Sequence, residues 1–213
     1  NMTPDILIFT NGRSTTLPAI EYGAWLGASM RTSVRLIGLD EHPSPSQIDE
    51  ETHPLEGIFA EAVEVFKKAG VAYQLEVQKG YAEDVIPRRS QGQDALLVVG
   101  PLGRPPLKRL LSGRSFRHIM EQVAAPILYV PHVRLPLKRI LVCLGGLGYE
   151  VTAETLAMQM AQMAHAEIVL FTVVPPIDLD YPEARHVSEN WEHLADTNTL
   201  TGKSLRRGLE IAR

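Results

Sequence analysis

Residues Val98–Ser115 read VVGPLGRPPLKRLLSGRS, and this segment decides the fold class. It begins at the end of the apolar run Ala95–Val99 and contains Gly100, Gly103 and Gly113, in the spacing GxxG, nine residues, then G. Glycine lets successive backbone N–H groups point into one concavity, because a Cβ would block both the required conformations and the approach of an anion. A helix that begins just after the third glycine would direct its N-terminal dipole at the same point. The segment therefore predicts a phosphate-binding loop between a strand and a helix.

The chain around this loop alternates between short apolar runs, which predict strands, and amphipathic segments, which predict helices. The predicted strands are Ile6–Thr10, Val34–Leu39, Val71–Val77, Ala95–Val99 and Ile127–Val130. The predicted helices are a first one that Thr16 caps and that ends near Met30, a second from Leu55 to Gly70, a short one from Ala82, and one from Phe116 to Gln122. The segment from Asp40 to Pro54 is predicted to be a loop, and the alternating strand Val71–Val77 an edge. This order predicts an α/β fold with a doubly wound parallel sheet, whose ligands bind at the carboxyl ends of the strands.

The sequence also repeats itself, since Ile6 falls on Ile140 and Gly12 on Gly146 at one common offset of 134 residues. A first domain over residues 1–131 and a second over 137–213 follow from this repeat, with Pro131–Pro136 as the linker. The second copy is predicted to have strands ending at Leu144 and spanning Ile168–Val174, a helix from Thr152 to Ala164, and a helix from Glu189 to the end of the chain. It therefore corresponds to the N-terminal part of the domain only, so the tandem repeat is incomplete in this chain.

Composition narrows the functional classes. A formal charge of −4 and a pI near 6.0 give no global basic bias, so we expect no nucleic-acid partner. No apolar run approaches the roughly 20 residues that span a bilayer, so we expect no membrane segment. The single cysteine, Cys143, excludes an intrachain disulfide framework and is expected to be a small buried residue in a strand. These features predict a cytoplasmic protein.

The glycine spacing, the residues that fill it, and the following segment Ala125–Val130 resemble the universal stress proteins (UspA-like), in their tandem two-domain form. The resemblance implies a Rossmann-like five-stranded sheet in the order 3-2-1-4-5. It also implies that an acid after strand one holds a ribose, that the residue closing strand two meets adenine, and that the glycine loop takes phosphates. In this sequence those positions are Asn11, Leu39 and Gly100–Ser115.

The implied site is an adenine-nucleotide site, for ATP with Mg²⁺ or another adenine nucleotide. Its residues are Thr10, Asn11, Gly12, Leu39, Val99, Gly100, Gly103, Gly113, Arg114 and Ser115. Two of them depart from the family pattern. Asn11 replaces the acid and offers a hydrogen bond but no carboxylate, while Arg114 stands where Ser or Thr should follow the third glycine. Arginine can pair with a polyphosphate or fill the site with its own bulk, and both interpretations stay open.

No catalytic constellation and no set of metal ligands can be assembled from the sequence, so we expect a protein that is not an enzyme. The first hypothesis is a stress-response regulator that works as a nucleotide-binding module. The alternative is an interaction protein with empty, degenerate sites, in which the two copies pack as a pseudo-dimer or the chain forms a homodimer. A slow ATPase is the third hypothesis.

Overall fold

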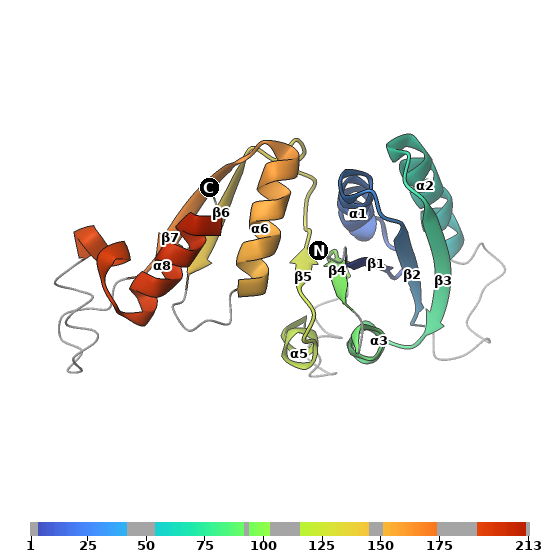
Figure 1. Ribbon diagram of the computed structural model, residues 1–213. Coiled ribbons are helices and arrows are strands. Elements are labelled where there is room, and N and C mark those ends of the chain that lie inside the picture. Colours follow the sequence, from blue (N-terminus) through green and yellow to red (C-terminus); the bar gives the residue numbers. More distant parts are fainter. Residues whose placement is uncertain are drawn as a thin grey trace. The chain divides into compact units, whose positions relative to one another are not determined.

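The computed structural model describes residues 4–41, 54–91, 94–102, 116–144, 151–173 and 191–211 (Figure 1). The chain divides into two compact units, Asn1–Val133 and Arg134–Arg213, here called unit 1 and unit 2. Each unit has its own sheet. No helix in the described part of the chain is both long enough and apolar enough to span a membrane.

Unit 1 is built around a parallel sheet in the order β3-β2-β1-β4-β5. Its strands are β1 (Asp5–Thr10), β2 (Val34–Asp40), β3 (Tyr73–Lys79), β4 (Ala95–Val99) and β5 (Ile127–Tyr129). Its helices are η1 (Ser14–Thr16), α1 (Leu17–Met30), α2 (Pro54–Ala69), α3 (Ala82–Ser90) and α5 (Phe116–Gln122). The predicted α/β class, strand order and edge position of β3 are confirmed. The predicted loop lies outside the described residues, apart from its two ends in β2 and α2 and from Glu41.

One face of the sheet packs against α1 and α2, and glycines bring the layers close together. A Cβ on Gly27 of α1 would lie 2.5 Å from Cγ1 of Val34 and 2.7 Å from Cγ2 of Val71. A Cβ on Gly38 of β2 would lie 2.7 Å from Cζ of Phe59 in α2. These spacings are too short for a side chain, so glycine is what allows the helices to pack this tightly on the strands.

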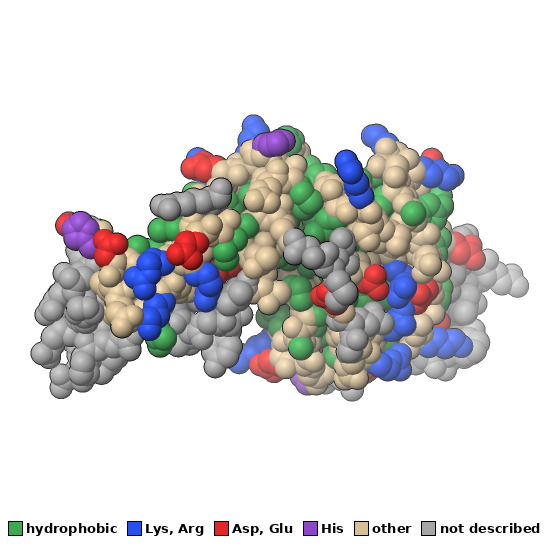
Figure 2. Space-filling model, viewed as in Figure 1, with side chains coloured by type: hydrophobic (Ala, Val, Ile, Leu, Met, Phe, Trp, Pro, Cys, Tyr) green, Lys and Arg blue, Asp and Glu red, His purple; other side chains and the backbone are tan. Residues whose placement is uncertain are grey.

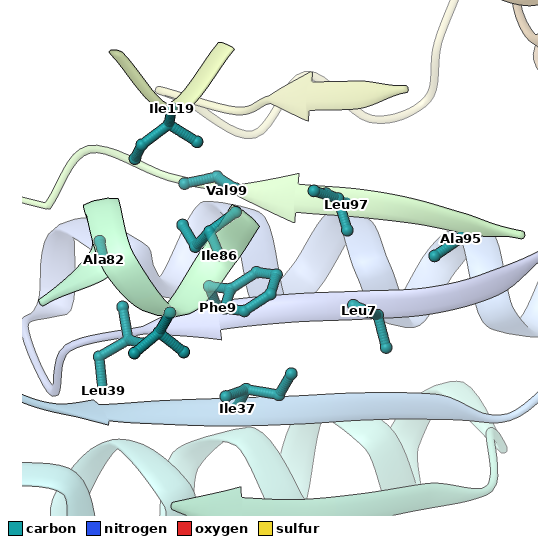
Figure 3. Close-up of a cluster of buried hydrophobic side chains, with 11 residues drawn as sticks. Leu7, Phe9, Ile37, Leu39, Ala82, Ile86, Ala95, Leu97, Val99 and Ile119 are labelled. Atoms are coloured by element: carbon teal, nitrogen blue, oxygen red, sulfur yellow. The ribbon is translucent and has the colours of Figure 1, made fainter. Parts of the chain in front are cut away.

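The other face of the sheet is covered by α3 and α5 (Figure 3). Leu7 and Phe9 of β1 meet residues from the neighbouring strands and from both helices in one buried cluster. Its members are Leu7, Phe9, Ile37, Leu39, Ala82, Val85, Ile86, Ala95, Leu97, Val99 and Ile119. The strands are apolar on both faces because helices cover both, as expected for a parallel sheet.

α1 ends where predicted, but its first turn is not capped as predicted. Thr16 precedes α1, but its hydroxyl donates to the carbonyl of Arg13 at 2.7 Å and makes no capping bond to α1. The predicted cap is therefore wrong, because Thr16 is itself in a helical conformation at the end of η1. At the other end, Arg31 has φ 54°, and the N–H of Thr32 donates to the carbonyl of Gly27 at 3.0 Å, which forms a Schellman motif.

Unit 2 contains a two-stranded parallel sheet and the helices packed on it. Its elements are β6 (Arg139–Leu144), α6 (Val151–Ala164), β7 (Glu167–Thr172), η3 (Trp191–Asp196) and α8 (Leu200–Ile211). β6 and α6 begin and end 134 residues after β1 and α1, and the pair Ile140↔Ile168 repeats Ile6↔Val34 at the same offset. His165, with φ 51°, repeats the left-handed residue Arg31. That unit 2 is a second copy of the same domain stays a prediction.

The last helix of unit 2 is shorter than predicted. The sequence predicts one helix from Glu189 to the end, but η3 ends at Asp196 and α8 begins at Leu200. The hydroxyl of Thr197 donates to the carbonyl of Leu194 at 2.8 Å, and the N–H of Gly202 donates to Thr199 Oγ1 at 3.0 Å. Threonine side chains thus close one helical segment and cap the next, which ends the continuous helix that periodicity alone predicts.

One face of the β6–β7 sheet is buried and the other is exposed. Leu144 and Leu170 point toward Gly208 of α8. The opposite face carries apolar side chains that are largely exposed: Leu141 (59%), Phe171 (49%) and, just after β7, Val173 (70%). Cys143 lies on this face and is exposed, so the prediction of a buried cysteine is wrong. Strand alternation places it on the face opposite to the helices.

An ion pair with a buried carboxylate and a partly exposed guanidinium joins the two long helices of unit 2. Glu154 of α6 is fully buried, and both of its carboxylate oxygens accept from Arg207 of α8, at 3.1 and 3.2 Å. In Figure 2, basic side chains gather over α8, the helix to which Arg207 belongs. The bidentate contact fixes the position of α8 against α6.

Candidate functional site

The candidate site lies at the carboxyl edge of the sheet of unit 1. β1 pairs with β2 on one side and with β4 on the other. From β2 the chain continues to β3 at one edge of the sheet, and from β4 it continues to β5 at the other edge. The last paired residues of β1 and β4 are Phe9 and Val99. This edge is the topological switch point of the sheet, the place where open α/β sheets bind ligands.

The turn after β1 is held by a buried hydroxyl pair. Thr10 Oγ1 and Thr16 Oγ1 lie 2.5 Å apart, and both side chains are fully buried. The N–H of Gly12 donates to Thr10 Oγ1 at 3.2 Å, and Gly12 has φ 82°, a conformation that a side chain would strain. The turn therefore has a single defined shape.

The turn is hydrogen-bonded to the start of the glycine segment after β4. Thr15 Oγ1 donates to the carbonyl of Pro101 at 2.7 Å, and Asn11 Nδ2 donates to the carbonyl of Leu102 at 2.8 Å. A Cβ on Gly100 would lie 3.2 Å from both the Thr15 carbonyl oxygen and the Thr16 Cα. The turn after β1 and the segment after β4 are thus hydrogen-bonded to each other across the switch point, although they lie more than 80 positions apart in the sequence.

Asn11 has one group engaged and one unpaired. Its Nδ2 donates to Leu102, whereas its Oδ1 is buried and accepts no hydrogen bond. A buried acceptor without a donor costs about 1–3 kcal/mol. Asn11 therefore links the end of β1 to the start of the glycine segment, and its amide oxygen has no donor among the described residues.

Glu41 belongs to the same site, although the sequence motifs did not single it out. It follows β2, and its Oε2 lies 3.5 Å from Asn11 Nδ2 while its Oε1 accepts from the N–H of Ala82, the first residue of α3, at 3.4 Å. Its position directly after the carboxyl end of a central strand is the signal that could have identified it. The residue was missed because it falls in the predicted loop.

The site residues predicted from the sequence divide into three groups. Thr10, Asn11, Gly12 and Gly100 come together at the carboxyl edge. Leu39 and Val99 lie at the ends of adjoining strands, but their side chains belong to the buried core cluster, so only their backbones are available to a ligand. Gly103, Gly113, Arg114 and Ser115 lie outside the described residues.

Among the described residues, no group of three or more histidine, cysteine, aspartate or glutamate side chains is placed to hold a metal ion. The described site offers hydroxyls, backbone N–H groups, an amide and one carboxylate. Such groups recognise a polar ligand by hydrogen bonds. An asparagine acceptor without a donor fits a ligand that carries hydroxyl or amino hydrogens.

No protein-family model and no curated protein sequence matches the chain. Solved structures do match its fold. A universal stress protein from Archaeoglobus fulgidus DSM 4304 aligns over 98% of this chain and 92% of its own, with a TM-score of 0.61 and 13% identity. A universal stress protein in complex with cAMP aligns over 61% of this chain and 98% of its own, with a TM-score of 0.47 and 19% identity. A protein of the universal stress protein family from Burkholderia pseudomallei aligns over 61% of this chain and 96% of its own, with a TM-score of 0.41 and 22% identity.

The first of these alignments spans nearly the whole chain at a TM-score above 0.5. It agrees with the strand order, the switch point and the doubly wound layers found in unit 1. The chain therefore has the fold of the universal stress proteins.

Proposed function

We propose that the chain is a universal stress protein and that unit 1 binds an adenine nucleotide at the carboxyl edge of its sheet. The protein works as a binding module: nucleotide occupancy changes its stability and its contacts, and no covalent step is required.

One observation carries this proposal. The turn after β1 holds the start of the glycine segment after β4 by two hydrogen bonds, Thr15 to Pro101 and Asn11 to Leu102. These bonds fix the point where the chain enters Gly103–Ser115, the segment whose glycine spacing predicts a phosphate-binding loop. A preformed entry lowers the entropy cost of closing a loop around a polyphosphate.

The polar groups at the site support binding more than turnover. The described residues at the carboxyl ends of β1, β2 and β4, namely 10–16, 39–41 and 99–102, include no histidine or cysteine. The carboxylate of Glu41, which contacts Asn11, also accepts a hydrogen bond from the N–H of Ala82. When bound, Mg²⁺ would neutralise phosphate charge. Asn11 would then orient the sugar side of the ligand, and Gly100 would let the backbone approach it.

The test is isothermal titration calorimetry with ATP and Mg²⁺, with thermal shift as a second readout. We expect saturable binding and a rise in Tm at millimolar ATP. Gly100→Ala should weaken ATP binding by about tenfold or more, because its Cβ would press on the backbone of Thr15 and Thr16. Gly57→Ala is the matched control, since a Cβ at that position would have no atom within 4 Å.

A third variant tests the phosphate end. Arg114→Ala should weaken ATP more than adenosine if the guanidinium pairs with phosphate. Absence of both heat and thermal stabilisation with the unmodified chain at millimolar ATP, adenosine and AMP would overturn the proposed function.

A further inference from the structure

The outer edge of β3 is open in the described part of unit 1. The strand pairs with β2 along its whole length and lies at one end of the sheet order (Figure 1). An edge strand presents a row of backbone N–H and C=O groups that can pair with a further strand. Residues 73–78 contain no proline and no lysine, the residues that commonly block such pairing. The edge can therefore accept one more strand through main-chain hydrogen bonds.

The face of β3 toward α2 carries exposed apolar side chains. The ring centroid of Tyr73 lies 5.2 Å from that of Phe66 in α2, which places the odd-numbered residues of the strand on this face. Leu75 is 38% exposed and Val77 is 55% exposed. Both side chains lie at alternate positions beside the open edge, so apolar side chains of an added strand would cover them.

The opposite face of β3 carries an excess of positive charge. Glu76 accepts from Arg89 Nη2 of α3 at 2.6 Å, and its other carboxylate oxygen lies 3.2 Å from Arg35 Nε of β2. Two guanidinium groups thus share one carboxylate, and the three side chains are between 24% and 30% exposed. Arg89 Nε is buried and has no hydrogen-bond partner among the described residues. The cluster has more donors than acceptors, so it favours a further carboxylate.

We propose that β3 binds an extended segment of another protein, which adds to the open edge as a further strand and carries an acidic residue between two apolar ones. The two apolar residues cover Leu75 and Val77. The acidic residue lies on the opposite face beside Glu76, where Arg89 pairs with both carboxylates.

The charge of the cluster also distinguishes this partner from a second copy of the chain. A second β3 would bring two arginines with its one carboxylate, so the excess of positive charge would remain. A segment that carries an acidic residue and no arginine compensates that charge. The favoured partner is therefore a different, acidic strand.

The experiment measures the binding of two synthetic peptides to the unmodified chain by fluorescence anisotropy. The peptide STVEVTS has the proposed pattern, and STVKVTS replaces its acidic residue with lysine. We expect the acidic peptide to bind about tenfold more tightly, because it gains an ion pair and avoids repulsion. Arg89→Gln should remove most of this preference. Arg88→Gln is the matched control, since this exposed neighbour in α3 carries the same charge, and the variant should keep the preference.

Methylation of the peptide backbone tests the strand addition without changing the protein. Two versions of the acidic peptide are N-methylated, one at the odd-numbered and the other at the even-numbered residues, so that each loses the N–H groups along one of its edges. One version should bind like the unmethylated peptide, and the other at least tenfold more weakly. Equal affinities of the two versions, whether retained or lost, would overturn the strand addition.

Three further results would overturn the proposal. The first is equal affinity of the unmodified chain for the acidic and the basic peptide, and the second is no binding of either peptide at millimolar concentration. The third is a dimer in sedimentation velocity that Val77→Lys dissolves, because a second copy would then cover β3. If Arg89→Gln does not fold, the preference of the unmodified chain for the acidic peptide still decides the matter.

Discussion

At the scale of single residues, two positions in the described part of the chain adopt a backbone conformation that their side chains disfavour. Arg31 and His165 have φ of 54° and 51° and occupy equivalent places after α1 and α6. At each of them the left-handed residue lets the chain close the end of the helix by Schellman bonding. Glycine is the usual residue there, so neither position could be identified from the sequence.

Arg31→Gly should therefore stabilise unit 1. The left-handed conformation costs a residue with a Cβ about 1–2 kcal/mol, and the extra freedom of glycine in the unfolded chain offsets part of that gain. We expect a net increase of about 0.5–1 kcal/mol in the free energy of unfolding, measured by urea denaturation. Ala28→Gly, an exposed position inside the same helix, is the control and should destabilise by about 1 kcal/mol. Equal effects of the two variants would contradict this account.

The position of the candidate site could be predicted from the sequence, but the contacts of its residues could not. Asn11 and Gly12 were placed at the correct edge, because an apolar run that stops at a polar turn marks the carboxyl end of a strand. The partners of Asn11, namely Leu102 and Glu41, are set by which strands become neighbours, and the local pattern carries no such information.

At the scale of helices and strands, the strongly periodic segments were predicted well. The helix predicted from Leu55 to Gly70 is α2, and the strands of unit 1 match within about two residues at each end. The break at residues 197–199 in the helix predicted to run from Glu189 to the end has a local cause, since the hydroxyls of Thr197 and Thr199 compete with backbone hydrogen bonding. An apolar pattern continues through such a break, so periodicity alone misses it.

Thr199→Ala should loosen the start of α8. The variant removes the acceptor for the N–H of Gly202 and the hydroxyl contact with Thr197, so we expect a loss of about 1 kcal/mol of stability. Circular dichroism and thermal denaturation measure it. Thr199→Ser retains the hydroxyl and should stay close to the unmodified chain, and a loss as large as that of the alanine variant would contradict the capping role.

The ion pair between α6 and α8 can be tested by a double-mutant cycle. Arg207→Met leaves the fully buried carboxylate of Glu154 without its bidentate partner and should cost about 3 kcal/mol or more in unfolding free energy. Combining it with Glu154→Gln should recover part of that loss, because the uncompensated charge is then gone. Additive effects of the two single substitutions in urea denaturation would show that the pair is not coupled.

At the scale of the whole molecule, the two units differ in how their sheets are covered. Phe9 and Ile37 of unit 1 are buried under α3 and α5, while the residues 134 positions later, Cys143 and Phe171, are exposed. The sequence predicted the apolar character of both faces. It could not predict which face helices would cover, because that depends on contacts between distant segments. The strand order 3-2-1-4-5 came from the family resemblance and not from periodicity.

This exposed apolar face should make the chain associate at high concentration. Phe171→Lys places a charge on this face and should therefore weaken the association. In sedimentation velocity, larger species should then appear only at a concentration about tenfold higher. Val77→Lys, at an exposed apolar position on edge strand β3 of unit 1, is the control. Cys143 is the single thiol, so its rate of reaction with a thiol reagent reports coverage directly and should fall as the unmodified chain is concentrated. A rate that does not change with concentration would contradict the prediction.

The central position of β1 also has a consequence for the order of folding. Among the strands of this sheet, β1 is synthesised before β2 and β4. Its pairing with β2 closes a short stretch of chain, whereas its pairing with β4 must wait until Ala95–Val99 has been made. Loops that close over short distances form earlier than those that close over long ones. During synthesis the middle strand of the finished sheet is thus for some time an edge strand, whose free N–H and C=O groups can pair with a chaperone or with another nascent chain.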